Sequence, residues 1–130
     1  MSLRILIIED NEQNMYMLSY LLEDKCQILQ AYNGTDGIHL ALEKSPDVIL
    51  LDIQLPGMDG YAIAGELIKN PSTRGIPIIA VTSYAMVGDK ERIMKAGATG
   101  YIEKPIDPDN FISQMISFLP ENLVNKMNLP

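Results

Sequence analysis

The sequence predicts a doubly wound α/β fold built on one parallel, five-stranded sheet. Five short apolar runs alternate with segments of helical period along a chain of 130 residues, a length typical of one domain. Several of these runs are apolar at nearly every position, which is typical of strands buried on both faces. Five units of strand followed by helix indicate right-handed crossovers, with helices on both faces of the sheet.

The expected strands coincide with the apolar runs. They cover Leu3–Ile8, Cys26–Ala31, Val48–Leu51, Ile76–Val81 and Gly100–Ile102. In a doubly wound sheet, ligands bind at the carboxyl ends of the strands, beside the point where the strand order reverses. The residues that end each run are therefore the first candidates for function.

The segments between the strands predict five helices. Asn11 is a suitable N-cap for the first helix, and Asp89 begins the fourth, which ends near Ala96–Gly97. Asp107 begins the fifth, with Pro108 just inside it. The apolar faces of the five helices are formed, in chain order, by Met15, Leu18 and Leu22, by Ile38, Ala41 and Leu42, by Ile63, Leu67 and Ile68, by Ile93, and by Phe111, Ile112, Met115 and Ile116.

Residues 1–119 are expected to form the domain, and residues 120–130 a C-terminal tail. The tail is too short to be an effector domain. It is expected either to extend the last helix or to hang free of the domain.

Composition excludes several classes of function. Ten basic and 17 acidic residues give a net charge of −7, which argues against binding to nucleic acid or to an anionic membrane surface. No apolar run approaches the length of a membrane-spanning helix. Cys26 is the single cysteine, so a reducing, cytoplasmic compartment and the absence of a disulfide framework are expected. We expect a monomer.

Polar residues gather at the carboxyl ends of four expected strands. Glu9 and Asp10 end the first strand, Asp52 the third, Thr82 and Ser83 the fourth, and Glu103, Lys104 and Pro105 the fifth. Two like charges about 4 Å apart repel by roughly 4 kcal/mol at an effective dielectric of about 20. Without a partner, at least one of three neighbouring carboxylates should take up a proton, and a divalent cation would remove the conflict. Oxygen ligands together with open positions for water and phosphate are typical of Mg²⁺.

This arrangement favours phosphoryl chemistry. Asp52 is the candidate nucleophile, which would become an acyl phosphate, while Lys104 and Mg²⁺ neutralise charge. Asp10 and Asp52 are the candidates to hold the metal directly, and Glu9 to hold it through water. The backbone carbonyl of Gln54 is the candidate to complete the protein ligands.

The motifs "IIEDN", "LLDIQLPGMDG" and "VTSYAMVGDKERIMKAGATGYIEKPI" resemble, in this order, the receiver domain of two-component response regulators. The resemblance covers about residues 3 to 118, and the "EDNEQN" and "AMVGDKER" segments are most similar to receivers of hybrid histidine kinases and of single-domain cell-cycle regulators. It implies a flavodoxin-like (βα)5 fold and Mg²⁺-dependent phosphorylation of Asp52. The implied donor is a phosphohistidine on a sensor histidine kinase or histidine phosphotransfer protein, and a downstream protein receives the signal.

The same resemblance assigns roles to further residues. It implies that Thr82 is the switch hydroxyl and Tyr101 the switch aromatic. It also implies that Lys104 is the lysine found at this position throughout the family, and that the peptide bond from Lys104 to Pro105 is cis. Gln54 and Tyr84 match positions that flank the route of the water that hydrolyses the acyl phosphate. Because both side chains are bulky, we expect a phosphate lifetime of minutes or longer, with slow self-catalysed hydrolysis rather than enzymatic turnover.

Two other functions stay open at the level of sequence. A phosphatase of the haloacid-dehalogenase type also uses an aspartate nucleophile and Mg²⁺, but it needs a second aspartate two positions on, where this chain has Gln54. A receiver-like module that binds a partner without being phosphorylated is the other alternative. The full set of acids, Thr82 and Lys104 argues against it.

Overall fold

A five-stranded parallel sheet forms the centre of the computed structural model, which describes residues 2–55, 57, 59–83 and 87–129. The strand order is β2-β1-β3-β4-β5, and every neighbouring pair is parallel. The strands are β1 (Arg4–Ile8), β2 (Gln27–Ala31), β3 (Val48–Asp52), β4 (Ile78–Thr82) and β5 (Gly100–Glu103). The order reverses between β1 and β3, so the predicted doubly wound sheet is confirmed.

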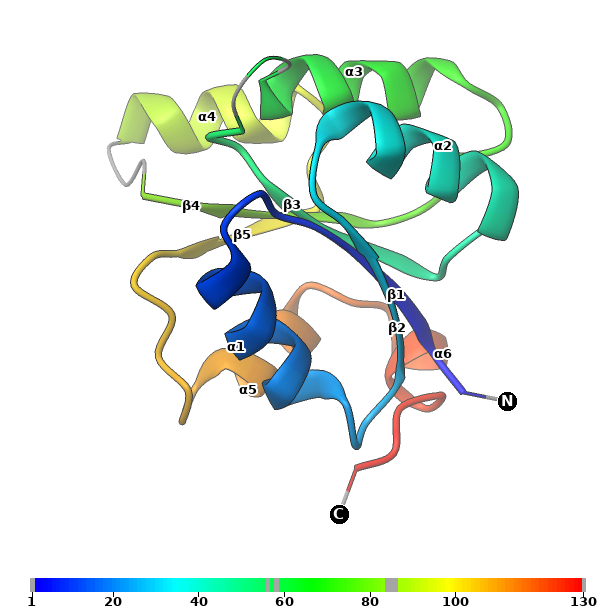
Figure 1. Cartoon of the computed structure of the whole chain (residues 1–130), viewed down its shortest axis with the longest axis vertical. Helices are drawn as coiled ribbons and strands as arrows, with labels where there is room; N and C mark the ends of the chain where they lie inside the picture. Colours follow the sequence, from blue (N-terminus) through cyan, green and yellow to red (C-terminus); the bar gives the residue numbers. More distant parts are fainter. Residues whose placement is uncertain (1, 56, 58, 84–86, 130) are drawn as a thin grey trace.

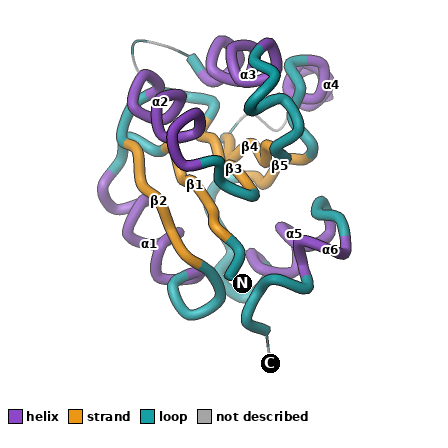
Figure 2. The backbone as a smooth tube through the Cα atoms, turned by 90° about the vertical axis from the view of Figure 1, so that its right-hand side faces the viewer, coloured by secondary structure: helices purple, strands orange, loops and turns teal. Residues whose placement is uncertain are grey.

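Helices cover both faces of the sheet (Figures 1 and 2). They are α1 (Glu12–Leu22), α2 (Gly34–Lys44), α3 (Gly60–Lys69), α4 (Val87–Lys95), α5 (Phe111–Ser117) and α6 (Glu121–Val124). One apolar cluster lies under α1 and α5, and a second lies under α2, α3 and α4. Within the described residues, no helix is both long and apolar enough to cross a membrane.

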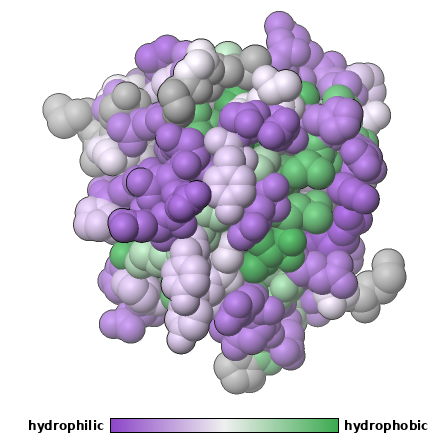
Figure 3. Space-filling model, viewed as in Figure 1, coloured by the Kyte–Doolittle hydropathy of each residue, from purple (hydrophilic) through white to green (hydrophobic). Residues whose placement is uncertain are grey.

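The outer strand β2 is less buried than the inner strands β3 and β4. Every residue of β3 and β4 is buried, whereas β2 has exposed and half-buried positions, including Ile28 and Leu29. Figure 3 shows hydrophobic residues reaching the surface in the right half of the molecule, where Figure 1 places β2. β2 is therefore an edge strand with one open side.

The packing of α2 departs from the prediction. Leu42, expected on the apolar face, is 42% exposed, while Gly34, Gly37 and Ala41 are buried. A Cβ atom on Gly37 would lie 2.5 Å from Ile8 Cδ1, so this helix approaches the sheet through its smallest residues. Its buried face is thus set by the space above the sheet rather than by hydrophobicity alone.

Most helix ends lie close to their predicted positions. Asn11 caps α1 by accepting a hydrogen bond from the Asn14 N–H at 2.9 Å, as predicted. Gly97 follows the end of α4 with a φ of 112°, a conformation that glycine adopts without strain. α5 begins at Phe111 rather than at Asp107, because a turn precedes the helix. In this turn the Asp107 side chain accepts a hydrogen bond from the Asp109 N–H at 3.1 Å.

The C-terminal tail is folded against the domain and neither extends α5 nor hangs free. Leu119, Leu123 and Met127 are buried in the α1–α5 cluster. The Leu3 N–H donates to the carbonyl oxygen of Lys126 at 3.2 Å, which ties the tail to the residue preceding β1. The tail therefore lies at the amino ends of the strands.

Candidate functional site

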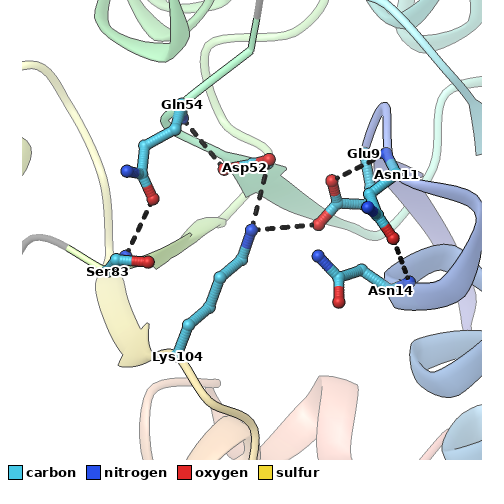
Figure 4. A network of polar contacts seen from close by, with 7 residues as sticks. All are labelled: Glu9, Asn11, Asn14, Asp52, Gln54, Ser83 and Lys104. Atoms are coloured by element: carbon cyan, nitrogen blue, oxygen red, sulfur yellow. Dashed lines mark hydrogen bonds and ion pairs between the residues drawn. The ribbon is translucent and has the colours of Figure 1, made fainter.

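Three carboxyl groups meet at the carboxyl ends of β1 and β3 (Figure 4 draws Glu9 and Asp52). Asp52 is the last residue of β3, and Glu9 and Asp10 directly follow β1, its neighbour in the sheet. One carboxylate oxygen from each of the three lies within 4.8 Å of the others. Glu9 is 1% exposed and Asp52 3% exposed, whereas Asp10 is open to solvent.

Lys104 bridges the two buried carboxylates. It follows β5, and its Nζ lies 3.2 Å from Glu9 Oε1 and 3.3 Å from Asp52 Oδ2 (Figure 4). Its backbone N–H donates to the carbonyl oxygen of Thr82 at 2.8 Å, and the bond to Pro105 is cis, as the resemblance implied. One cation thus faces a pair of carboxylates from two strands.

The electrostatics of the site are dominated by Glu9. Burial, a hydrogen bond that protonated Glu9 can share with Asp52, and the charge of Asp52 raise the pKa of Glu9 to about 7. The Asn11 N–H, which donates to Glu9 Oε2 at 3.2 Å, and the Lys104 ammonium both act to lower this pKa. With a pKa of about 7, the Glu9 carboxyl group can lose its proton near neutral pH when a cation binds beside it.

The acidic cluster fits a hard divalent metal ion. Glu9 Oε1 is buried and, among the described residues, makes no hydrogen bond of good geometry, although Lys104 Nζ lies nearby. This oxygen atom already faces the Lys104 ammonium at 3.2 Å, and the three carboxyl groups together offer the oxygen ligands that Mg²⁺ prefers. Glu9, Asp10 and Asp52 are therefore the residues able to hold it.

Gln54 ties together the loops that follow β3 and β4. Its N–H donates to Asp52 Oδ1 at 2.9 Å, and its side-chain Oε1 accepts from the Ser83 N–H at 3.0 Å (Figure 4). The sequence predicted a role for the Gln54 carbonyl oxygen and, by resemblance, one for its bulky side chain, but it missed the hydrogen bond from the Ser83 N–H. The only signal for it was that Ser83 directly follows a residue at a strand end.

The two expected switch residues lie near the site on neighbouring strands. Thr82 is the last residue of β4 and is fully buried. Tyr101 on β5 is half-buried, with its ring centroid 6.1 Å from that of Phe118. Tyr84, the other expected neighbour of the water route, lies outside the described residues.

A close approach of the backbone shapes the loop beneath Asp52. The Gly60 N–H, at the start of α3, donates to the Ile53 carbonyl oxygen at 3.0 Å. A Cβ atom on Gly60 would clash with the backbone at Ile53 Cα, so only glycine fits here. Gly57, in the same loop, has a φ of 84°. The two glycines let the chain turn sharply directly after Asp52, at the carboxyl end of β3.

The site combines a buried carboxylate, a lysine and a cluster of three acids. Asp52 has one oxygen atom held by the Gln54 N–H and the other facing the Lys104 ammonium. This arrangement can neutralise the charge on a phosphoryl group as it moves onto a carboxylate oxygen.

This chain is similar in sequence to proteins of a known family. A family model described as the response regulator receiver domain matches residues 5–116. The polar-differentiation response regulators DivK of Brucella anthropi and Brucella ovis are 42% and 41% identical over 116 and 120 residues. These matches cover 88% and 92% of this chain, and 94% and 98% of the relatives.

Solved structures agree with the fold. The receiver domain of a sensor histidine kinase from Pseudomonas aeruginosa, with a magnesium ion coordinated in its active site cleft, is 28% identical with a TM-score of 0.80. The match covers 91% of this chain and 98% of that one. The chemotaxis protein CheY4 of Vibrio cholerae, at 23% identity and a TM-score of 0.86 over 92% of this chain and all of its own, supports the fold alone.

Proposed function

The chain belongs to the response regulator receiver domain family, and on this premise we propose that Asp52 is its phosphoacceptor. The observation that carries the proposal is the position of Lys104 Nζ, which follows β5 and lies 3.3 Å from Asp52 Oδ2 at the end of β3. A buried carboxylate beside a lysine and two further acids is suited to accept a phosphoryl group. If Asp52 only capped the turn that follows β3, the hydrogen bond from the Gln54 N–H would be sufficient, and the lysine and the other acids would have no role.

The transfer would proceed by in-line displacement. A carboxylate oxygen of Asp52 forms a bond to phosphorus as the bond between phosphorus and the donor imidazole nitrogen breaks. The electron pair of the broken bond stays on the imidazole, which is then protonated from solvent. Lys104 neutralises charge on the oxygen atoms of the phosphoryl group, and the Gln54 N–H holds Asp52 in place.

A divalent cation belongs to this proposal. Mg²⁺ would be held by Asp10 and Asp52 directly, by Glu9 through water and by the Gln54 carbonyl oxygen, and it would supply positive charge for the phosphoryl oxygens. Support comes from the buried Glu9 oxygen that makes no good hydrogen bond among the described residues. The magnesium ion in the Pseudomonas receiver is consistent with this proposal.

Signalling would follow from a shift between two packings. A phosphoryl group on Asp52 offers acceptor oxygens to the Thr82 hydroxyl, one strand away in the sheet. Movement of Thr82 makes room for Tyr101 to turn inward, which changes the surface formed by α4, β5 and α5. That surface would then meet a downstream protein.

Partners and location follow from the same proposal. Receiver domains interact in general with histidine kinases and downstream targets. For this chain we propose a sensor histidine kinase or histidine phosphotransfer protein as donor, a monomeric state, and a cytoplasmic location. We also propose residues 1–119 as the receiver domain and 120–130 as an appended tail.

Intact-mass spectrometry after incubation with Mg²⁺ and acetyl phosphate separates this function from its two alternatives. A single phosphoryl adduct that decays over minutes supports the switch. Continuous release of phosphate from acetyl phosphate and from phosphomonoesters would support a phosphatase, and absence of any adduct would support a binding module. Gln54 already disfavours the phosphatase, because its side-chain oxygen accepts from the Ser83 N–H and its amide group is too weak an acid to protonate a leaving group.

A further inference from the structure

The described side chains of α4, residues 88–95, contribute little apolar burial to its packing on the domain. Among its described side chains, residues 88–95, Ile93 is the buried one, and the neighbouring Met94 is 44% exposed. α3, a helix of similar length, buries Ile63, Ala64 and Leu67. Because apolar burial is the main source of packing free energy, α4 depends more than α3 on other contacts.

Two cations on α4 supply such contacts on opposite sides of the helix. The Lys90 Nζ lies 4.9 Å from the centroid of the Tyr101 ring on β5. The Arg92 Cζ lies 3.9 Å from the centroid of the Tyr61 ring on α3. Both distances are inside the range of about 6 Å over which a cation is attracted to an aromatic face. Residues two apart on a helix point in roughly opposite directions, so the two contacts brace α4 from both sides.

The Lys90 contact is reinforced. Its Nζ also lies 3.1 Å from Glu103 Oε1, so one ammonium group joins two residues of β5 to α4. Figure 1 places α4 beside α3 and close to β4 and β5, in agreement with both contacts. We name these contacts the Lys90 brace, made with Tyr101 and Glu103, and the Arg92 brace, made with Tyr61.

We propose that Lys90 and Arg92 are positioning residues that hold α4 in its resting place and so set the fraction of molecules in the switched state. The proposal rests on the function proposed for Asp52 and Thr82. Thr82 ends the strand that leads into α4, and Tyr101 is the ring that must turn inward. When this ring turns inward it leaves Lys90, so the Lys90 brace opposes the switch directly.

The size of the effect can be bounded. An exposed cation on an aromatic ring changes an equilibrium by about twofold to fivefold. The two braces use different rings on different elements, so their effects should multiply to about fourfold to twenty-five-fold in the double variant. The braces therefore bias the switch without locking it.

Hydrogen exchange of the α4 amides in the full chain tests the anchoring. Lys90→Met and Arg92→Met should each speed exchange in α4 by about twofold to fivefold, and leave α2 unchanged. Lys95→Met is the matched control, because Lys95 is an exposed cation on the same helix without a ring contact among the described residues. Tyr61→Phe should retain the Arg92 brace and Tyr61→Leu should lose it. Exchange in both brace variants equal to that of Lys95→Met would overturn the proposal.

The rate of phosphorylation by acetyl phosphate tests the coupling. If the switched state reacts with the donor, each brace variant should react faster by the same factor as its α4 exchange, with an unchanged Mg²⁺ midpoint. Faster exchange with an unchanged reaction rate would refute the coupling. If the wild type gains no phosphoryl group at all, the function proposed for Asp52 fails, while the exchange data still decide whether the braces anchor α4.

Discussion

The Lys104 ammonium group lies 3.3 Å from Asp52 Oδ2, which joins the end of β5 to the end of β3 across the intervening β4. Both groups are largely buried, with Asp52 3% and the Lys104 side chain 18% exposed. A charge pair this far from water is costly to break, because each ion has lost much of its hydration. The ion pair therefore contributes both to the stability of the fold and to the charge of the site.

Replacing Lys104 should destabilise the metal-free protein. Lys104→Met leaves two buried carboxyl groups without their cation, and the free energy of unfolding should fall by about 3 kcal/mol at pH 8. Urea denaturation in the presence of a chelator measures this loss. Lys104→Arg keeps the charge and should lose much less. Equal stability of Lys104→Met and the parent would contradict the pairing.

The pKa of Glu9 predicts how stability depends on pH. Its value in the folded state, about 7, lies above its ordinary value of 4.5, so the folded protein binds the proton more tightly than the unfolded chain. This contribution to stability is fully present below pH 4.5 and is lost as the pH rises through 7. Glu9→Gln should remove it.

Thermal melting of the metal-free protein between pH 5 and pH 8 measures the effect. The difference in melting temperature between the parent and Glu9→Gln should change across the interval from about pH 4.5 to 7. Saturating Mg²⁺ should flatten the dependence of the parent, because the metal ion competes with the proton. A parent that shows the same pH dependence as Glu9→Gln would contradict the assignment.

Truncating the tail contacts should lower stability without affecting the site. Leu123 is 9% exposed and packs with Met127 against the α1–α5 cluster, so Leu123→Ala should cost about 2–3 kcal/mol of unfolding free energy. Asn122→Ala, at an exposed position of the same helix, is the control. Denaturation curves measure both, and phosphorylation by acetyl phosphate should be unchanged, because the tail lies at the opposite end of the sheet. A slower reaction in Leu123→Ala under conditions where it is fully folded would show that the tail communicates with the site.

The Gln54 side chain should lengthen the life of the acyl phosphate. The Ser83 N–H fixes it beside Asp52, where the resemblance places the route of the attacking water. Gln54→Ala opens this route and should speed loss of the phosphoryl group severalfold. Decay of the phosphorylated protein after removal of the donor measures the rate. An unchanged rate would assign the long lifetime to other residues.

Much of the site was predictable because the ends of buried strands can be recognised in the sequence. The apolar runs that end in Asp52 and Thr82 fix these residues at one edge of a parallel sheet, whatever the details of the helices. The contact of Lys104 with Glu9 follows from the same topology. Strand ends are thus set by a local pattern together with one global rule.

The remaining features depend on packing in three dimensions. Hydrophobicity assigned Leu42 to the buried face of α2, but Ile8 leaves room there only for Gly37 and other small residues. The docking of Leu123 in the tail depends on an apolar cluster that includes residues more than a hundred positions earlier, such as Leu3. The bridge from Gln54 to the Ser83 N–H joins two loops whose relative position no local pattern records.

The role of Asp52 as a metal-dependent phosphoacceptor is tested most directly by the transfer of one phosphoryl group to the parent and to Asp52→Asn, each with Mg²⁺ and with a chelator, followed by intact-mass spectrometry. This role predicts an adduct on the parent in the presence of Mg²⁺, and none on the variant or in the chelator. An adduct of equal yield on Asp52→Asn, or on the parent without any divalent metal, would contradict it.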